Sequence, residues 1–138
     1  KPDFSIFGIG DYSFTKFKVA ISGLYKTTHF TLITPDNSKP LMLDDTCYFI
    51  GFEKLELAQI AHYLLNSEIV QKFIKSIVFE DSKRPINKDT LMRIDIEKAF
   101  HYLNFQKAKA LIPNLDIKDW SEFEQNLKAT LQKQTSLF

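Results

Sequence analysis

The stretch from residue 64 to residue 96 reads LLNSEIVQKFIKSIVFEDSKRPINKDTLMRIDI, and it contains an amphipathic helix between two breaks in the chain. Its apolar residues recur at steps of three and four, which places on one helical face Ile69, Val70, Phe73, Ile74, Ile77 and Val78. The opposite face carries Gln71, Lys72, Lys75 and Ser76. This pattern predicts a helix with one buried side and one basic side.

The breaks on either side of this helix are marked by capping residues and by a proline. Asn66 and Ser67 have short polar side chains that accept hydrogen bonds from free backbone N–H groups, so they predict the end of one helix and the cap of the next. Pro85 forces the preceding residue out of helical geometry, which predicts a turn over residues 80–85. Asn87 then predicts the start of a new helix. A short basic turn is thus expected between two anchored helices.

The first 52 residues predict strands, because aromatic and β-branched runs alternate there with turn-forming residues. The expected strands span residues 4–7, 17–22, 29–34 and 41–52, the last with a bend at Asp44-Asp45. The glycine pair Gly8 and Gly10 fits a turn better than a cofactor loop, since no helical pattern follows it.

From residue 53 onward glycine and proline become rare, and apolar residues recur at helical spacing. Further helices are expected over residues 53–65 and 96–112. A last helix is expected from Ser121, which has a capping-box spacing to Glu124. Its apolar stripe consists of Trp120, Phe123, Leu127 and Leu131.

Strands first and helices after predict an α+β fold, with a small, largely antiparallel sheet in the N-terminal half and a helical unit of four to five helices behind it. We expect one domain over residues 1–138, with a sheet part (1–52), a helical part (53–112) and a C-terminal helix (113–138). A chain of this length buries roughly two-thirds of its unfolded surface in a single core.

Composition fits a folded globular protein, with 44% apolar and 25% charged residues and a net charge of +1. The single Cys47 rules out an internal disulfide and fits a reducing compartment. No apolar segment is long enough to span a membrane and no export signal opens the chain, so we expect a cytoplasmic protein. Because the first residue is Lys1 and not Met, we expect a piece of a longer polypeptide.

Catalytic chemistry has little support in these residues. The three histidines lie far apart and no zinc-type ligand spacing occurs. Asp44-Asp45, with Asp36 and a later Asp116 and Lys118, loosely fits a metal-dependent nuclease, although Asp116 also fits a helix start. No nucleophile elbow or phosphate loop is found. We expect no catalytic residue, cofactor site or metal site in this chain.

The residue pattern of the first two-thirds of the chain resembles the target-recognition domain of N6-adenine DNA methyltransferases of bacterial restriction-modification systems. The likeness covers residues 4–96, and departs from the family at Thr15-Lys16, where members often have Ala-Pro. It is carried by FSIFGIG (4–10), YSF (12–14), KVAISG (18–23), DDTCYF (44–49), LNS (65–67) and SKRPIN (82–87).

The resemblance implies a DNA-reading part of a methyltransferase, or of a fused restriction-modification enzyme. In that family a separate catalytic domain binds S-adenosylmethionine and holds the flipped adenine with an Asn-Pro-Pro-Tyr type motif, which does not occur here. The implied partners are double-stranded DNA and the catalytic domain of the same parent chain, in a bacterial cytoplasm. The fragment would be non-catalytic by itself.

Location and side-chain chemistry select the residues expected to contact DNA, since cations position phosphates and polar groups read base edges. The phosphate candidates are Lys18, Lys26, Lys83, Arg84 and Lys88, and the base-edge candidates are Tyr25, Thr28, His29 and Ser82. Two alternatives stay open. One is a protein-interaction module that docks through Trp120, Phe123 and Leu127, and the other is a metal-dependent nuclease fragment.

Overall fold

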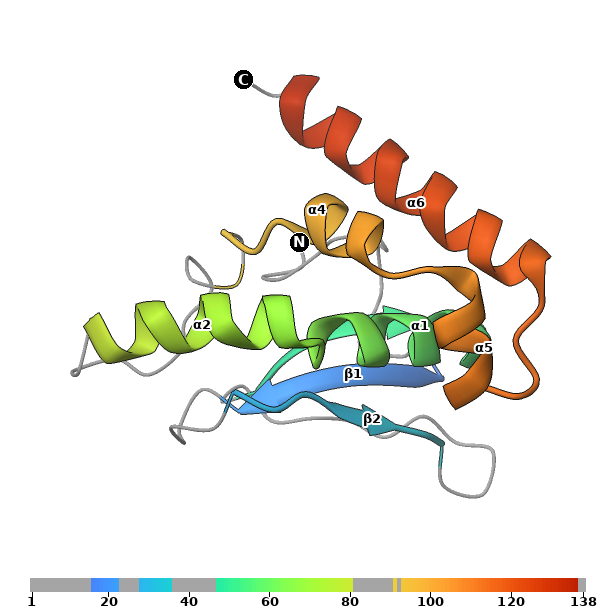
Figure 1. Cartoon of the computed structure of the whole chain (residues 1–138), viewed down its shortest axis with the longest axis horizontal. Coiled ribbons are helices and arrows are strands. Elements are labelled where there is room, and N and C mark those ends of the chain that lie inside the picture. Colours follow the sequence, from blue (N-terminus) through green and yellow to red (C-terminus); the bar gives the residue numbers. More distant parts are fainter. Residues whose placement is uncertain (1–15, 23–27, 36–46, 81–90, 92, 137–138) are drawn as a thin grey trace.

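A computed structural model describes residues 16–22, 28–35, 47–80, 91 and 93–136 (Figure 1). Its sheet has the order β2-β1-β3, and both pairs are antiparallel. The strands are β1 (Phe17–Ser22), β2 (Thr31–Ile33) and β3 (Cys47–Phe52). The helices that follow are α1 (Leu55–Leu65), α2 (Glu68–Glu80), α4 (Ile96–Tyr102), α5 (Phe105–Leu111) and α6 (Ile117–Ser136). The predicted α+β fold, a small antiparallel sheet followed by a helical unit, is confirmed.

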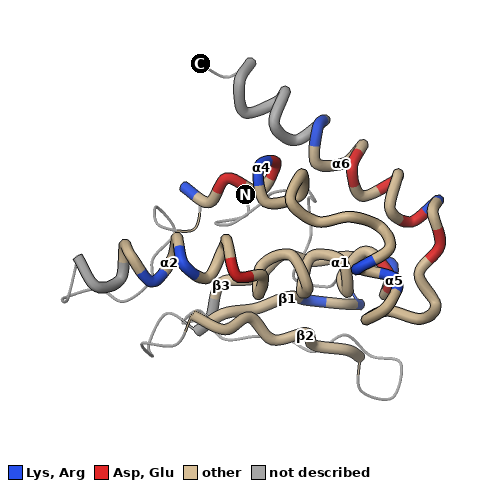
Figure 2. The backbone as a smooth tube through the Cα atoms, viewed as in Figure 1, with Lys and Arg blue, Asp and Glu red and all other residues tan. Residues whose placement is uncertain are grey.

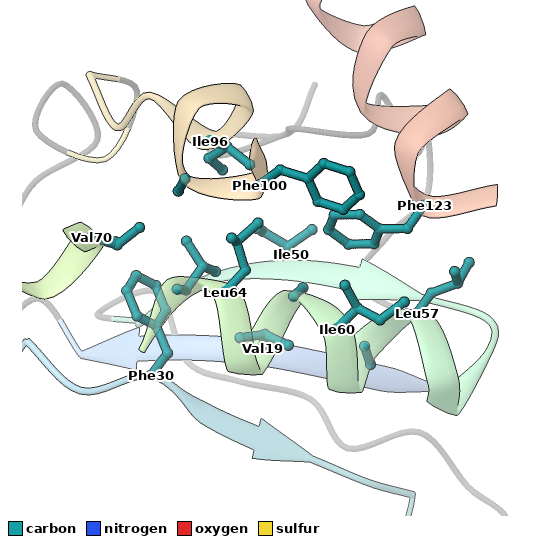
Figure 3. Packing of buried hydrophobic residues seen from close by; sticks show 14 of the residues in the cluster. Val19, Phe30, Ile50, Leu57, Ile60, Leu64, Val70, Ile96, Phe100 and Phe123 are labelled. Atoms are coloured by element: carbon teal, nitrogen blue, oxygen red, sulfur yellow. The ribbon is translucent and has the colours of Figure 1, made fainter. Parts of the chain in front are cut away.

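Helix α1 covers one face of the sheet, and the alternation of side chains along the strands decides which residues it buries. Val19 and Ile21 of β1 and Ile50 of β3 lie in the core with Ile60 and Leu64 of α1 (Figure 3). The register pairs Val19 with Ile50, so the two strands present one continuous apolar surface to the helix. This face of the sheet and the apolar side of α1 form the centre of the core.

The C-terminal helix α6 is attached to this core through aromatic rings. Phe100 of α4 stacks on Trp120 with ring centroids 4.7 Å apart and on Phe123 at 5.7 Å. Phe105 of α5 adds an edge contact to Trp120 at 6.2 Å. Of the predicted apolar stripe of the last helix, Trp120 is half-buried and Phe123 and Leu127 are each 1% exposed, so this part of the stripe faces inward. The side chains of Phe123 and Leu127 are not available to dock another protein. The side chain of Leu131 lies outside the described ones.

The prediction of one helix over residues 96–112 is wrong, because the chain breaks at Leu103 and Asn104. Leu103 has extended backbone angles (φ −92°, ψ 153°) and ends α4. The side chain of Asn104 accepts a hydrogen bond from the backbone N–H of Lys107 at 2.8 Å, and so caps α5. A capping asparagine inside an apolar pattern produces two short helices where periodicity alone predicts one long helix.

The prediction that the last helix begins at Ser121 is also wrong, since α6 begins at Ile117. Its cap is reciprocal. The N–H of Asp119 donates to Asp116 Oδ1 at 2.9 Å, and the N–H of Asp116 donates to Asp119 Oδ2 at 3.2 Å. The hydrogen bond from the Asp119 N–H lowers the pKa of Asp116, while burial raises the pKa of Asp119. The interpretation of Asp116 as a helix start is confirmed.

Several predicted elements lie outside the described residues. These are the strand at 4–7, the strand segment at 41–43, the acidic pair Asp44-Asp45 and the helix start at Asn87.

Phe100→Ala is expected to lower the free energy of unfolding by about 3–5 kcal/mol, since it empties a buried ring position between α4 and α6. Urea denaturation followed by circular dichroism measures the change. Leu111→Ala, at a side chain 64% exposed, is the control and should change stability by less than about 0.5 kcal/mol. Equal losses in the two variants would contradict the proposed attachment of α6.

Candidate nucleic-acid interface

The break between α1 and α2 falls at Asn66 and Ser67, as predicted, and the two side chains bond the end of α1 and the segment before β2. Ser67 Oγ donates a hydrogen bond to the backbone carbonyl of Leu64 at 2.6 Å. The backbone N–H of Asn66 bonds the carbonyls of His62 and Leu64, which closes the last turn of α1. The Asn66 side chain does not take part in closing this turn, and it points toward the chain segment before β2.

That segment, residues 28–30, is bound by the Asn66 amide group in the manner of a neighbouring strand. The N–H of Phe30 donates to Asn66 Oδ1 at 2.8 Å, and Asn66 Nδ2 donates to the carbonyl of Phe30 at 2.9 Å. Phe30 itself is fully buried in the core cluster beside Leu64 and Val70 (Figure 3). Main chain and side chain of Phe30 are thus both held by the α1–α2 junction.

Gln71, one turn into α2, binds the other end of the same segment. Its Nε2 donates to the carbonyl of Thr28 at 2.8 Å and to the carbonyl of Leu65 at 2.9 Å. Its Oε1 accepts from the Thr28 hydroxyl at 2.5 Å. We call the contacts of Asn66 and Gln71 with Thr28 and Phe30 the amide clamp. The clamp joins residues 36 and 43 positions apart in the sequence.

Between the two clamped residues, His29 projects outward and is exposed. Its ring meets the ring of His62 on α1 edge to face, with centroids 6.2 Å apart. Burial lowers the pKa of His62, the neighbouring His29 lowers it further, and a backbone hydrogen bond at Phe30 raises it partly back. An exposed imidazole is therefore presented from a fixed backbone, directly after residues 23–27.

The predicted DNA contacts are distributed unevenly in the structure. His29 lies on the surface, whereas Thr28 is 9% exposed and its hydroxyl is engaged by Gln71. Six other predicted contacts lie outside the described residues: Tyr25, Lys26, Ser82, Lys83, Arg84 and Lys88. Thr28 is bonded to α2 through Gln71, and the same helix ends at Glu80.

Lys18 has a location that the sequence did not suggest. It is 1% exposed and lies on the sheet face opposite to Val19, with Nζ 5.7 Å from the centre of the Phe49 ring. Burial lowers the pKa of Lys18, and the carboxylate of Glu53 partly opposes this shift. A contact between this ammonium group and a DNA phosphate would require the side chain to leave its buried position.

The basic side predicted for α2 is present among the described side chains. Lys72, Lys75 and Ser76 are exposed, while Val70 and Ile74 are buried. Figure 2 colours the lysine positions along α2 blue. Lys72 Nζ pairs with Glu68 Oε1 at 2.9 Å on an exposed surface. This helix leads directly into residues 81–90, which contain Lys83, Arg84 and Lys88.

Asn66 and Gln71 are functional candidates that sequence reasoning missed, because it assigned the first to a helix break and the second to the solvated face. The sequence signal that could have indicated their role is that both are amide side chains beside the apolar stripe of the helix. Within the described ranges, no group of three or more His, Cys, Asp or Glu side chains is arranged to bind a metal. In the same ranges no helix is both long and apolar enough to cross a membrane.

The fold and this site define an α+β chain in which the α1–α2 junction binds residues 28–30, the segment just before β2. Comparison with known proteins adds a relationship. Over 97 residues, which are 70% of this chain, it is 50% identical to the type II methyltransferase M.NspV of Nostoc sp.. The matched part is 20% of the length of that protein, so the chain spans about a fifth of its relative. The chain is thus related to a type II methyltransferase, in agreement with the coarser part of the resemblance. No protein-family model and no solved structure matches it.

Asn66→Ala is expected to lower the free energy of unfolding by about 1–3 kcal/mol, because it leaves the N–H and the carbonyl of Phe30 without their partner. Asn66→Asp should lose at least as much, since it sets a carboxylate oxygen against the Phe30 carbonyl. Urea denaturation measures both variants, with the exposed Gln125→Ala as control. A change within the error of the control would contradict the clamp.

Stability is expected to fall as the pH drops below about 6.5, in part through His62. The folded state lowers the pKa of His62, so the unfolded state takes up the proton first, and acid therefore favours unfolding. His62→Gln removes the titrating group but keeps a hydrogen-bond donor. The loss of stability between about pH 7.5 and 5.5 should be smaller in this variant. The same loss in both proteins would exclude a contribution from His62.

Proposed function

We propose that this chain is the sequence-reading part of a bacterial restriction-modification methyltransferase, and that it binds duplex DNA without carrying out the transfer itself. The observation that carries the proposal is the amide clamp together with the relationship to a type II methyltransferase. The clamp fixes the backbone on both sides of the exposed His29, at the end of a segment that contains Tyr25 and Lys26.

Physical reasons favour DNA as the partner of this surface. Recognition of a base edge needs a polar side chain held within hydrogen-bonding distance, which favours a reading residue on a rigid support. His29 meets this requirement, with its neighbours bonded to α1 and α2. The basic side of α2 and the cations at 83, 84 and 88 supply charge of the sign that attracts phosphates.

The methyl-transfer chemistry belongs to a catalytic domain in this proposal. S-adenosylmethionine would bind there, together with the adenine to be modified, and this chain would hold the duplex in register. For Thr28 we propose a different role from the base contact expected from the sequence. Because its hydroxyl is engaged by Gln71, it supports the reading segment in place of contacting a base.

Binding of the chain to mixed-sequence duplex DNA tests the proposal, by fluorescence anisotropy at several salt concentrations. We expect affinity to fall steeply as salt rises, since each neutralised phosphate releases counterions. Lys83→Ala with Arg84→Ala should weaken binding and reduce the slope of log K against log salt by about 2.

The matched control is Lys107→Ala with Lys118→Ala, which removes the same charge from exposed positions on α5 and α6. Figure 1 shows α5 at the opposite end of α1 from the α1–α2 junction. The control should keep the wild-type slope. Equal effects of the two double variants would indicate non-specific attraction, and no binding at low salt would overturn the proposal.

A further inference from the structure

Gln71 is bound in a way that leaves its side chain one orientation. Nε2 faces the carbonyl oxygens of Thr28 and Leu65, and it also lies 3.5 Å from Asn66 Oδ1. Oε1 faces the hydroxyl of Thr28. Turning the amide over would bring oxygen against two carbonyl oxygens, so the hydrogen-bond pattern fixes it. The group is half-buried and serves the chain's own backbone.

The clamp determines the direction in which the side chain of His29 points. Thr28 and Phe30 point inward and are held, so His29 between them must point outward, as in an extended chain. The contact between the rings of His29 and His62 limits the imidazole from one side. Asn66, which caps the C-terminus of α1, follows His62 by four residues, so the ring contact and the clamp lie on the same side of the helix end.

We propose that Gln71 is a positioning residue for sequence discrimination: it fixes the main chain at Thr28, so that His29 meets the base pairs of duplex DNA in one register. Gln71 itself is proposed to make no contact with DNA. The inference rests on the proposed function. It adds that His29 contacts the DNA while Gln71 of α2 holds the main chain beside it in place.

Loss of the clamp has different consequences for the two kinds of DNA contact. An ion pair between a lysine and a phosphate is long-range and tolerates displacement of the chain. A hydrogen bond to a base edge weakens steeply once its distance or angle changes. A loosened segment at residue 28 should therefore lower affinity for a preferred sequence much more than affinity for DNA in general.

The experiment begins with selection of duplexes from a randomised library by the wild-type chain. The dissociation constant is then measured for the selected duplex and for a scrambled duplex of the same composition. In Gln71→Ala the ratio of the two constants should fall about tenfold, the size of one base-edge contact. Affinity for the scrambled duplex and the salt slope should stay at the wild-type values. Gln71→Glu should behave like Gln71→Ala, because it keeps the size but loses the Nε2 donor.

Two further variants keep the test decisive. Thr28→Val removes only the hydroxyl bond to Gln71 at nearly constant volume, and should reduce the ratio less but in the same direction. It decides the question if the Gln71 variants fail to fold. Gln106→Ala removes an exposed glutamine from α5 and should leave the ratio unchanged. Thermal melting of every variant accompanies the binding data.

The outcomes separate this inference from the proposed function. If the wild-type chain binds no duplex, the proposed function is overturned and the inference with it. If the wild-type chain discriminates and the folded Gln71 and Thr28 variants keep the same ratio, the inference alone is overturned. An equal loss on both duplexes would also overturn it, since a merely structural role weakens all binding together.

Discussion

The two hydrogen bonds between the Asn66 amide and the peptide groups of Phe30 tie the sheet to the helical unit. Strand pairing of β2 with β1 runs from Thr31 to Ile33, so Phe30 stands just before the ladder. A buried peptide group without a partner is costly, and Asn66 supplies the partner that a strand would otherwise provide. The break between α1 and α2 is placed where the amide can reach this peptide group.

Apolar packing and polar bonding have separate tasks at this junction. The Phe30 ring, fully buried beside Leu64 and Val70, sets how deep the segment sits against the helices. Close packing alone tolerates small rotations of a backbone. The amides of Asn66 and Gln71 remove that freedom, because each bonds a carbonyl and a second polar group in a fixed direction. Depth and register of the segment thus have different physical origins.

Periodicity predicted the elements whose side chains face one core. It predicted the strands at 17–22 and 47–52 and the two helices that flank Asn66. It also predicted that Phe123 and Leu127 lie on the apolar side of the last helix. It failed where a single polar side chain overrides the pattern, at the Asn104 cap. The choice of Lys18 as a phosphate contact came from its location and charge, and it did not anticipate that this side chain is 1% exposed. For the site, the sequence indicated His29 but not Asn66 or Gln71, because a bond across 36 or 43 residues has no local signal.

The clamp bonds chiefly main-chain atoms, which determines how the proposed reading surface can vary. The Asn66 side chain bonds the N–H and the carbonyl of residue 30, and Gln71 Nε2 bonds the carbonyl of residue 28. None of these bonds depends on which side chain occupies position 29. The side chain at position 29 can therefore change, and with it the base pair that it would meet under the proposed function, while the geometry that presents it stays the same. Within residues 28–30, the hydroxyl of Thr28 is a side-chain group that bonds the clamp, so position 28 is constrained by this bond and position 30 by packing.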